Sequence, residues 1–229
     1  MNIKIYADGA NLDEIKELNK NPLISGYTVN PTLMKKAGIT DYEGFCRETL
    51  KYIDGKPISY EVFSDDFNEM FWQAKKIASF GKNVYVKIPV TNTEGLKSNQ
   101  LITKLVREGI KINVTAVLTK RQIEETIQSL GDFDSIISIF AGRVADTGVD
   151  PRQIVKHGVI QKYPKQKILW ASCREILNII QADECNADII TVPNDILKKM
   201  NLIGKSLEEL SLDTIKMFYN DAVQSGYKL

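Results

Sequence analysis

The chain of 229 residues has a single histidine, His157, and only three cysteines, Cys46, Cys173 and Cys185. Zinc enzymes hold their metal with several imidazole or thiolate ligands, and a Ser-His-Asp hydrolase needs a histidine beside its nucleophile. His157 lies in a stretch with helical spacing, residues 152–162, and we expect it at the surface. The cysteines have neither metal-type nor redox-type spacing, which favours reduced thiols. The sequence therefore argues against metal-dependent and histidine-based catalysis.

An excess of one charge is also lacking, since 30 Lys and Arg residues balance 29 Asp and Glu residues for a net charge of +1. The basic residues are scattered, so no nucleic-acid surface is indicated. No G-x-G-x-x-G or G-x-x-x-x-G-K-[ST] pattern indicates a nicotinamide or nucleoside triphosphate. No apolar run has the length of a membrane span, and Met1 and Asn2 lead directly into a strand pattern without a leader. We expect a cytoplasmic protein with neither a nucleic-acid nor a membrane partner.

A lysine interrupts the buried-strand pattern of residues 83–89. Side chains alternate along a strand, so the apolar set of Val84, Val86 and Ile88 leaves Lys87 on the other face. We expect Lys87 to point into the interior, where burial disfavours the charged ammonium and leaves more of the free amine. The free amine is the form that attacks a carbonyl in Schiff-base enzymes. The alternative for Lys87 alone is a structural ion pair.

Other strand patterns likewise carry polar groups on the face opposite their apolar residues, near the carboxyl end. These groups are Asp8 in residues 3–8, Ser59 and Glu61 in 57–62, Asn113 and Thr115 in 111–116, and Ser138 with Phe140 in 135–140. Polar groups at the carboxyl ends of several parallel strands indicate one shared pocket.

Segments with helical spacing separate the strand patterns. They lie at residues 69–78, ending near Gly81, at 99–108, ending near Gly109, and at 119–130, where Thr119 and Gln122 predict a capping box. Further strand patterns at 167–171 and 187–192 bring the total to about eight. This alternation predicts one α/β domain over residues 1–229, a (β/α)₈ TIM barrel. An additional C-terminal helix is expected within 206–229, with helical spacing from Leu212 to Val223 and an end at Gly226.

Two loops after strands carry candidate phosphate ligands. Arg143 follows the sixth strand, and Ser172 with Arg174 follows the seventh. Arginine side chains can clamp a phosphate with paired, charge-assisted hydrogen bonds. We therefore expect a phosphate group to bind where these loops converge.

Taken in order along the chain, these motifs resemble those of the transaldolase family of the class I aldolase superfamily. The resemblance rests on Asp8, Thr-Val-Asn-Pro-Thr at 28–32, Val-Lys-Ile-Pro-Val-Thr at 86–91, Asn-Val-Thr at 113–115, Phe-Ala-Gly-Arg at 140–143 and Ala-Ser-Cys-Arg at 171–174. The short chain is similar to the small-transaldolase and fructose-6-phosphate aldolase branch. Val29 and Cys173 depart from common family residues, at positions that are not catalytic in the family.

The resemblance implies transfer of a dihydroxyacetone unit from fructose 6-phosphate or sedoheptulose 7-phosphate to an aldose phosphate, in the pentose phosphate pathway. It implies Lys87 as the Schiff-base lysine, Asp8 as the acid-base group, and Glu61 with Thr115 as ligands of a catalytic water. The implied substrate-binding residues are Thr28, Asn30, Asn113, Ser138, Phe140, Arg143, Ser172 and Arg174. No cofactor or metal is implied.

Two positions distinguish the branches, since Glu61 and Phe140 match transaldolases where the aldolase branch carries glutamine and tyrosine. The alternatives are fructose-6-phosphate aldolase and, less favoured, a non-catalytic sugar-phosphate-binding or assembly barrel. The resemblance also implies a homo-oligomer, such as a decameric ring. In that assembly the C-terminal helix, whose apolar positions spread wider than one stripe, packs on a neighbouring subunit. The alternative is a helix that folds over its own barrel.

Overall fold

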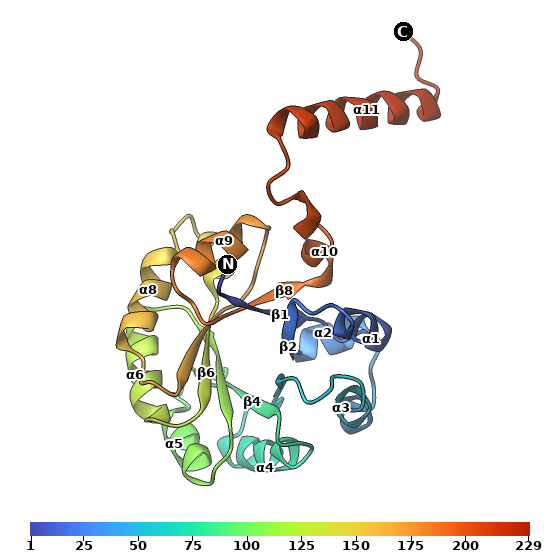
Figure 1. The fold of residues 1–229 in the computed structure, drawn as a ribbon. Helices are drawn as coiled ribbons and strands as arrows, with labels where there is room; N and C mark the ends of the chain where they lie inside the picture. The colour runs from blue at the N-terminus through green and yellow to red at the C-terminus, as the bar shows by residue number, and fades with distance from the viewer. The chain divides into compact units, whose positions relative to one another are not determined.

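The computed structural model describes residues 1–229, and its eight parallel strands close into a barrel in sequence order, with β1 paired to β8 (Figure 1). The strands are β1 Lys4–Asp8, β2 Ile24–Thr28, β3 Ile58–Glu61, β4 Val84–Pro89, β5 Ile112–Val117, β6 Ser135–Ile139, β7 Gln166–Trp170 and β8 Ile189–Pro193. This architecture confirms the predicted TIM barrel.

Helices connect successive strands and cover the outside of the barrel, and a further short helix follows β8 (Figure 1). They are α1 Leu12–Asn19, α2 Pro31–Lys36, α3 Tyr42–Leu50, α4 Phe67–Ala78, α5 Asn99–Arg107, α6 Lys120–Leu130, α7 Ala141–Ala145, α8 Arg152–Gln161, α9 Leu177–Glu184 and α10 Asn194–Leu197. The capping box predicted at Thr119 and Gln122 is present at the start of α6. None of the helices is long and apolar enough to cross a lipid bilayer.

The interior of the barrel contains a buried layer in which two tyrosines, Tyr6 from β1 and Tyr85 from β4, pack together with Ile136, Leu169, Ala171 and Ile189. Tyr85 and Lys87 are both buried and alternate with the apolar set of β4, as the strand pattern predicted. The interior therefore changes from aromatic at Tyr85 to charged at Lys87, toward the carboxyl ends of the strands.

Strand β2 was not among the strand patterns of the sequence. It contains Gly26, at which an added Cβ would lie only 2.6 Å from the Tyr6 ring. Glycine is required because the large Tyr6 side chain occupies the space in front of it. The requirement for glycine breaks the apolar alternation by which a strand is recognised.

Residues Lys198–Leu229 form a compact unit separate from Met1–Leu197. This unit contains a short 3₁₀ helix, Met200–Leu202, and α11, Leu207–Ser225, which begins before the predicted Leu212 because Ser206 caps it by accepting a hydrogen bond from Glu209 N. Gly226 ends α11 in the left-handed conformation, with φ of 66°, as predicted. No residue of α11 is buried.

Candidate active site

The predicted polar side chains meet inside the barrel, near the carboxyl ends of the strands. Strand pairing places Asp8 beside Thr28, Glu61 beside Lys87, and Lys87 beside Asn113. Parallel pairing with this register explains why residues distant in the sequence form one cluster. The strand patterns thus predicted correctly that these side chains lie together.

Lys87 forms a buried ion pair with Glu61. The Lys87 side chain is 6% exposed, and its Nζ lies 2.9 Å from Glu61 Oε2 and donates to the Val29 carbonyl at 3.3 Å. One charged and one neutral acceptor thus hold the Lys87 amine in the interior. The Glu61 carboxylate is close enough to accept a proton from Lys87, which would generate the nucleophilic amine.

Asp8 is a half-buried residue whose carboxylate accepts a hydrogen bond from one hydroxyl. Thr28 Oγ1 lies 2.7 Å from Asp8 Oδ1, and Thr191 Oγ1 lies 2.5 Å from Thr28 Oγ1. Burial raises the pKa of the Asp8 carboxyl, an effect that the Lys87 ammonium and the Thr28 hydrogen bond oppose and the Glu61 carboxylate increases. A carboxyl group with a raised pKa is suited to acid-base catalysis closer to neutral pH.

The two predicted asparagines have different environments. Asn113 donates from Nδ2 to Ser59 Oγ at 3.0 Å and accepts from Ser138 Oγ at 2.7 Å, so its amide orientation is fixed from both ends. Asn30 caps α2, because its Oδ1 accepts a hydrogen bond from Leu33 N at 2.9 Å. The amide NH₂ of Asn30 is therefore the end available to a substrate.

Thr115 is buried, and its Oγ1 has no hydrogen-bond partner within the protein. The next residue, Ala116, has a φ of 60°, and the register of β5 and β6 shifts between Val114 and Val117. A non-glycine residue in the left-handed region carries backbone strain, which is concentrated at functional sites. The unpaired hydroxyl beside a strained residue is consistent with the predicted binding of water by Thr115.

The loops after β6 and β7 are in close contact. A Cβ at Gly142 would lie 1.6 Å from the Ser172 carbonyl oxygen, and Ser172 itself has a φ of 63°. Only glycine permits this approach. The contact brings the loop of Arg143 against that of Ser172, the convergence on which the phosphate prediction depends.

The two predicted arginines lie at the surface rather than within the buried cluster. The Arg143 guanidinium lies over the Phe140 ring, 5.5 Å from its centroid. The Arg174 side chain is 51% exposed and pairs with Asp146, which the sequence analysis did not identify. Phe140 follows β6 rather than ending it, contrary to the predicted 135–140 strand, and packs on the tyrosine layer. A bound phosphate would thus compete with Asp146 for Arg174.

Ser59 was among the polar groups predicted for the shared pocket, and it contacts Asn113, whereas Thr191, which contacts Thr28, was not predicted. Thr191 is the central residue of β8, on the same face as Ile189 of the tyrosine layer, and it pairs with Tyr6 of β1. Because side chains alternate along β8 as they do along the other strands, strand alternation could have placed Thr191 on the inward face. No group of three or more His, Cys, Asp or Glu side chains is arranged to hold a metal ion.

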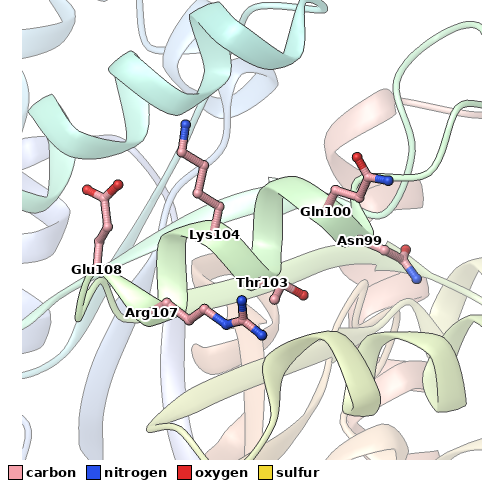
Figure 2. A pocket seen from close by; sticks show the side chains of 6 residues that line it. All are labelled: Asn99, Gln100, Thr103, Lys104, Arg107 and Glu108. Carbon is pink, nitrogen blue, oxygen red and sulfur yellow. The ribbon is translucent and has the colours of Figure 1, made fainter.

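A depression of about 480 Å³ lies on α5, away from this cluster (Figure 2). Its lining side chains all come from or directly follow that helix: Asn99, Gln100, Thr103, Lys104, Arg107 and Glu108. Lys104 points toward α4, where it lies 3.8 Å from the centroid of the Phe71 ring (Figure 2). None of the predicted site residues lines this depression.

Comparisons with known proteins identify the family of the chain. The family model described as Transaldolase/Fructose-6-phosphate aldolase matches residues 5–229. A protein named "Probable transaldolase" from Thermoanaerobacter sp. (strain X514) is 37% identical over 99% of this chain and 100% of its own. One of the same name from Thermoplasma volcanium is 38% identical over 91% of this chain and 92% of its own. The crystal structure of dihydrodipicolinate synthase from Rhodopseudomonas palustris shares the fold, with a TM-score of 0.56 and 14% identity over 83% of this chain and 69% of its own. The chain belongs to the transaldolase/fructose-6-phosphate aldolase family.

Proposed function

We propose that the chain is a transaldolase that moves a dihydroxyacetone unit between sugar phosphates through a Schiff base on Lys87. The observation that carries the proposal is the buried Lys87–Glu61 pair at 2.9 Å, inside the end of the barrel where Asp8 also lies. A lysine that can lose its proton to a neighbouring carboxylate is a nucleophile for a ketone. We propose the pentose phosphate pathway in the cytoplasm as its setting.

The first half of the reaction forms the imine. After Glu61 takes a proton from Lys87, the free amine attacks the C2 carbonyl of the ketose phosphate and gives a carbinolamine. Loss of the C2 oxygen as water gives an iminium, with protons moved by Asp8, Glu61 and a water held by Glu61 and Thr115. The unpaired hydroxyl of buried Thr115 supports its part in this step.

The second half breaks and remakes a carbon–carbon bond. Asp8 takes the C4 hydroxyl proton, the C3–C4 bond breaks, and its electrons pass to the iminium as an enamine while an aldose phosphate leaves. Asn30 and Asn113 bind hydroxyls of the retained unit, together with Thr28, Ser138 and Phe140, which surround it. The enamine then adds to a second aldose phosphate, and water releases the new ketose phosphate from the lysine.

The runner-up is fructose-6-phosphate aldolase activity, in which hydrolysis releases free dihydroxyacetone. Phe140 provides no hydroxyl at the position where that branch carries tyrosine, and Glu61 provides a carboxylate where that branch carries glutamine. A carboxylate and Thr115 would hold the water differently from a tyrosine hydroxyl. Transfer to erythrose 4-phosphate, compared with release of dihydroxyacetone, distinguishes the two activities.

The test is reduction with borohydride in the presence of fructose 6-phosphate, followed by peptide mass mapping. We expect a stable sugar adduct on the peptide that contains Lys87 and on no other, because only an iminium is reduced to a stable amine. Lys87→Arg should abolish both labelling and turnover, since a guanidinium forms no such imine.

Lys167→Arg is the matched control. Lys167 is also a strand lysine in an ion pair, with its Nζ 2.5 Å from Asp134 Oδ1, but it lies at the amino end of β7. This variant should be labelled at Lys87 as the wild type is. Labelling of another lysine, or an active protein that is not labelled at all, would rule out the proposal.

A further inference from the structure

Two hydroxyl groups form a chain that ends on Asp8. Thr191 Oγ1 lies 2.5 Å from Thr28 Oγ1, and Thr28 Oγ1 lies 2.7 Å from Asp8 Oδ1. The three residues come from neighbouring strands, because β1 pairs with both β2 and β8. Thr28 and Thr191 are 2% and 5% exposed, so bulk water competes little for their hydroxyls.

The direction of this chain is fixed when Asp8 is ionised. A carboxylate only accepts hydrogen bonds, so Thr28 donates its single proton to Asp8 Oδ1. Thr28 then offers only lone pairs to Thr191, and Thr191 must be the donor in that contact. The Thr191 hydroxyl thus keeps the Thr28 proton directed at Asp8, and it strengthens the Thr28 bond by polarising it.

We propose that Thr191 is a positioning residue for Asp8 that acts through Thr28, an inference that rests on the proposed function. The chain occupies Oδ1 of Asp8 and leaves Oδ2 to take the proton of the substrate C4 hydroxyl. It also ties the carboxylate to β2 and, through Thr191, to β8. Because a general base must lie within hydrogen-bond reach of its proton, loss of this tie slows carbon–carbon cleavage more than imine formation.

The chain also favours the ionised form of Asp8. The ionisable groups that interact with Asp8 are Lys87 on β4, Glu61 on β3 and Cys173 in the loop after β7. Burial raises the pKa of the Asp8 carboxyl, and the Thr28 hydrogen bond is one of the effects that oppose the rise. Loss of the Thr191 donor weakens that bond and raises the pKa further. Since the base acts when ionised, the acid limb of the kcat profile moves to higher pH.

The experiment compares Thr191→Val, which keeps the shape of the side chain without its hydroxyl, with Thr191→Ser, which keeps the hydroxyl. We measure kcat for transfer from fructose 6-phosphate across pH and, in parallel, borohydride trapping at Lys87. Thr191→Val should lower kcat about 3- to 10-fold, the size expected for one hydrogen bond. It should also move the acid limb upward and leave trapping near the wild-type level, and Thr191→Ser should restore kcat and the acid limb.

A double-mutant cycle with Thr28→Val tests the route of the effect. If Thr191 acts only through Thr28, then Thr191→Val should have no further effect on kcat in the Thr28→Val background. An undiminished effect in that background, or equal losses for the valine and serine variants, would show a packing role and overturn the inference.

Titration of the Asp8 carboxyl carbon by NMR separates this inference from the proposed function, because it does not depend on turnover. We expect Thr191→Val to raise the titration midpoint of Asp8. An active wild type labelled at Lys87 whose Asp8 titration is unchanged by Thr191→Val overturns only the role of Thr191. A wild type without transfer or labelling overturns the proposed function itself.

Discussion

Asp8 and Glu61 are both carboxylates at strand ends, but their surroundings differ. Asp8 accepts a hydrogen bond from the Thr28 hydroxyl, whereas Glu61 forms an ion pair with the amine of Lys87. The backbone of Glu61 is also fixed, because the Tyr42 hydroxyl donates to its carbonyl oxygen at 2.6 Å. In the proposed reaction this difference assigns Asp8 to bond cleavage and Glu61 to imine formation.

Asp8→Ala should lower kcat for cleavage while Lys87 can still be trapped as an imine, and Glu61→Gln should lower the amount trapped. General acid-base groups typically contribute about 10² to 10⁴ in rate, so losses of that size are expected in turnover and trapping assays. If the turnover rate of either variant were within a few-fold of the wild-type rate, the role assigned to that residue would be wrong.

The pH dependence of kcat should follow the raised pKa of Asp8. The ordinary value for aspartate is about 3.9, and burial moves the folded-state value upward. Activity that needs the ionised base is lost as pH falls through that raised value. The acid limb measured with fructose 6-phosphate should therefore lie above the ordinary aspartate range, and it should disappear in the residual activity of Asp8→Ala.

Arg174 is the residue whose prediction the structure modifies most. Its exposed pair with Asp146 contributes about 0–1 kcal/mol, so replacing Asp146 by a phosphate as the partner of Arg174 costs little free energy. Arg174→Ala should raise KM for phosphorylated substrates by the equivalent of about 1.5–3 kcal/mol and leave unphosphorylated dihydroxyacetone nearly unaffected. Asp146→Asn is the matched control, and it should not raise KM for the phosphorylated substrates. Equal losses on both substrate types would assign Arg174 to the fold instead.

Residues at the ends of buried strands were predictable, and residues in the loops were less so. Alternation along β4 was enough to place Lys87 inside the barrel, because an apolar face on one side determines the other. Asp146 follows the short helix α7, where no alternation exists to indicate which partner a side chain meets. The sequence thus predicted Arg174 as a ligand without its competing carboxylate.

At the scale of elements, the loops after β6 and β7 depend on one glycine. Gly142→Ala would place a Cβ 1.6 Å from the Ser172 carbonyl oxygen, and backbone cannot move as a flexible side chain does. We expect a loss of about 1–3 kcal/mol in the free energy of unfolding, the usual cost of overpacking, together with a higher KM for phosphorylated substrates. Urea unfolding and steady-state kinetics measure the two effects.

Gly9→Ala is the control for unfolding, because no atom lies within 4 Å of a Cβ built at Gly9 and its φ is not in the left-handed region. Its free energy of unfolding should stay near the wild-type value. An equally stable Gly142→Ala would mean that the two loops separate at little cost.

The elements themselves were predictable to different degrees. Helix α6 could be predicted from its capping box and apolar spacing, since both are local. Strand β2 could not, because the need for Gly26 comes from Tyr6 on another strand. A sequence pattern reveals a feature when the residues that cause it lie in the same segment. A requirement that arises from a contact between two strands can be recognised only when the pairing of those strands is known.

At the scale of the whole molecule, α11 carries a set of exposed apolar side chains. Leu212, Ile215, Phe218, Tyr219 and Val223 are each at least half exposed in this chain. We propose, as the resemblance implies, that α11 packs on a neighbouring subunit of a homo-oligomer. Each Å² of apolar surface that α11 buries against the neighbouring subunit would stabilise the assembly by about 25 cal/mol.

Ile215→Lys with Phe218→Lys should therefore dissociate the assembly, because charges would replace apolar side chains in the contact. Asn220→Lys, on the polar face of α11, is the control and should leave the assembly intact. Light scattering gives the mass of each variant. A monomeric wild type, or an assembly unaffected by the double substitution, would contradict the proposal.

The tyrosine layer described above has a consequence for the order of events. Tyr6 and Tyr85 with their neighbours fill the barrel on the side of Lys87 away from the strand carboxyl ends. Substrates and products must therefore enter and leave at the carboxyl ends of the strands. The departing aldose phosphate and the arriving one would then use the same route and cannot pass each other. For the proposed reaction we therefore expect ping-pong kinetics, with parallel lines in double-reciprocal plots and each aldose phosphate inhibiting competitively against the other.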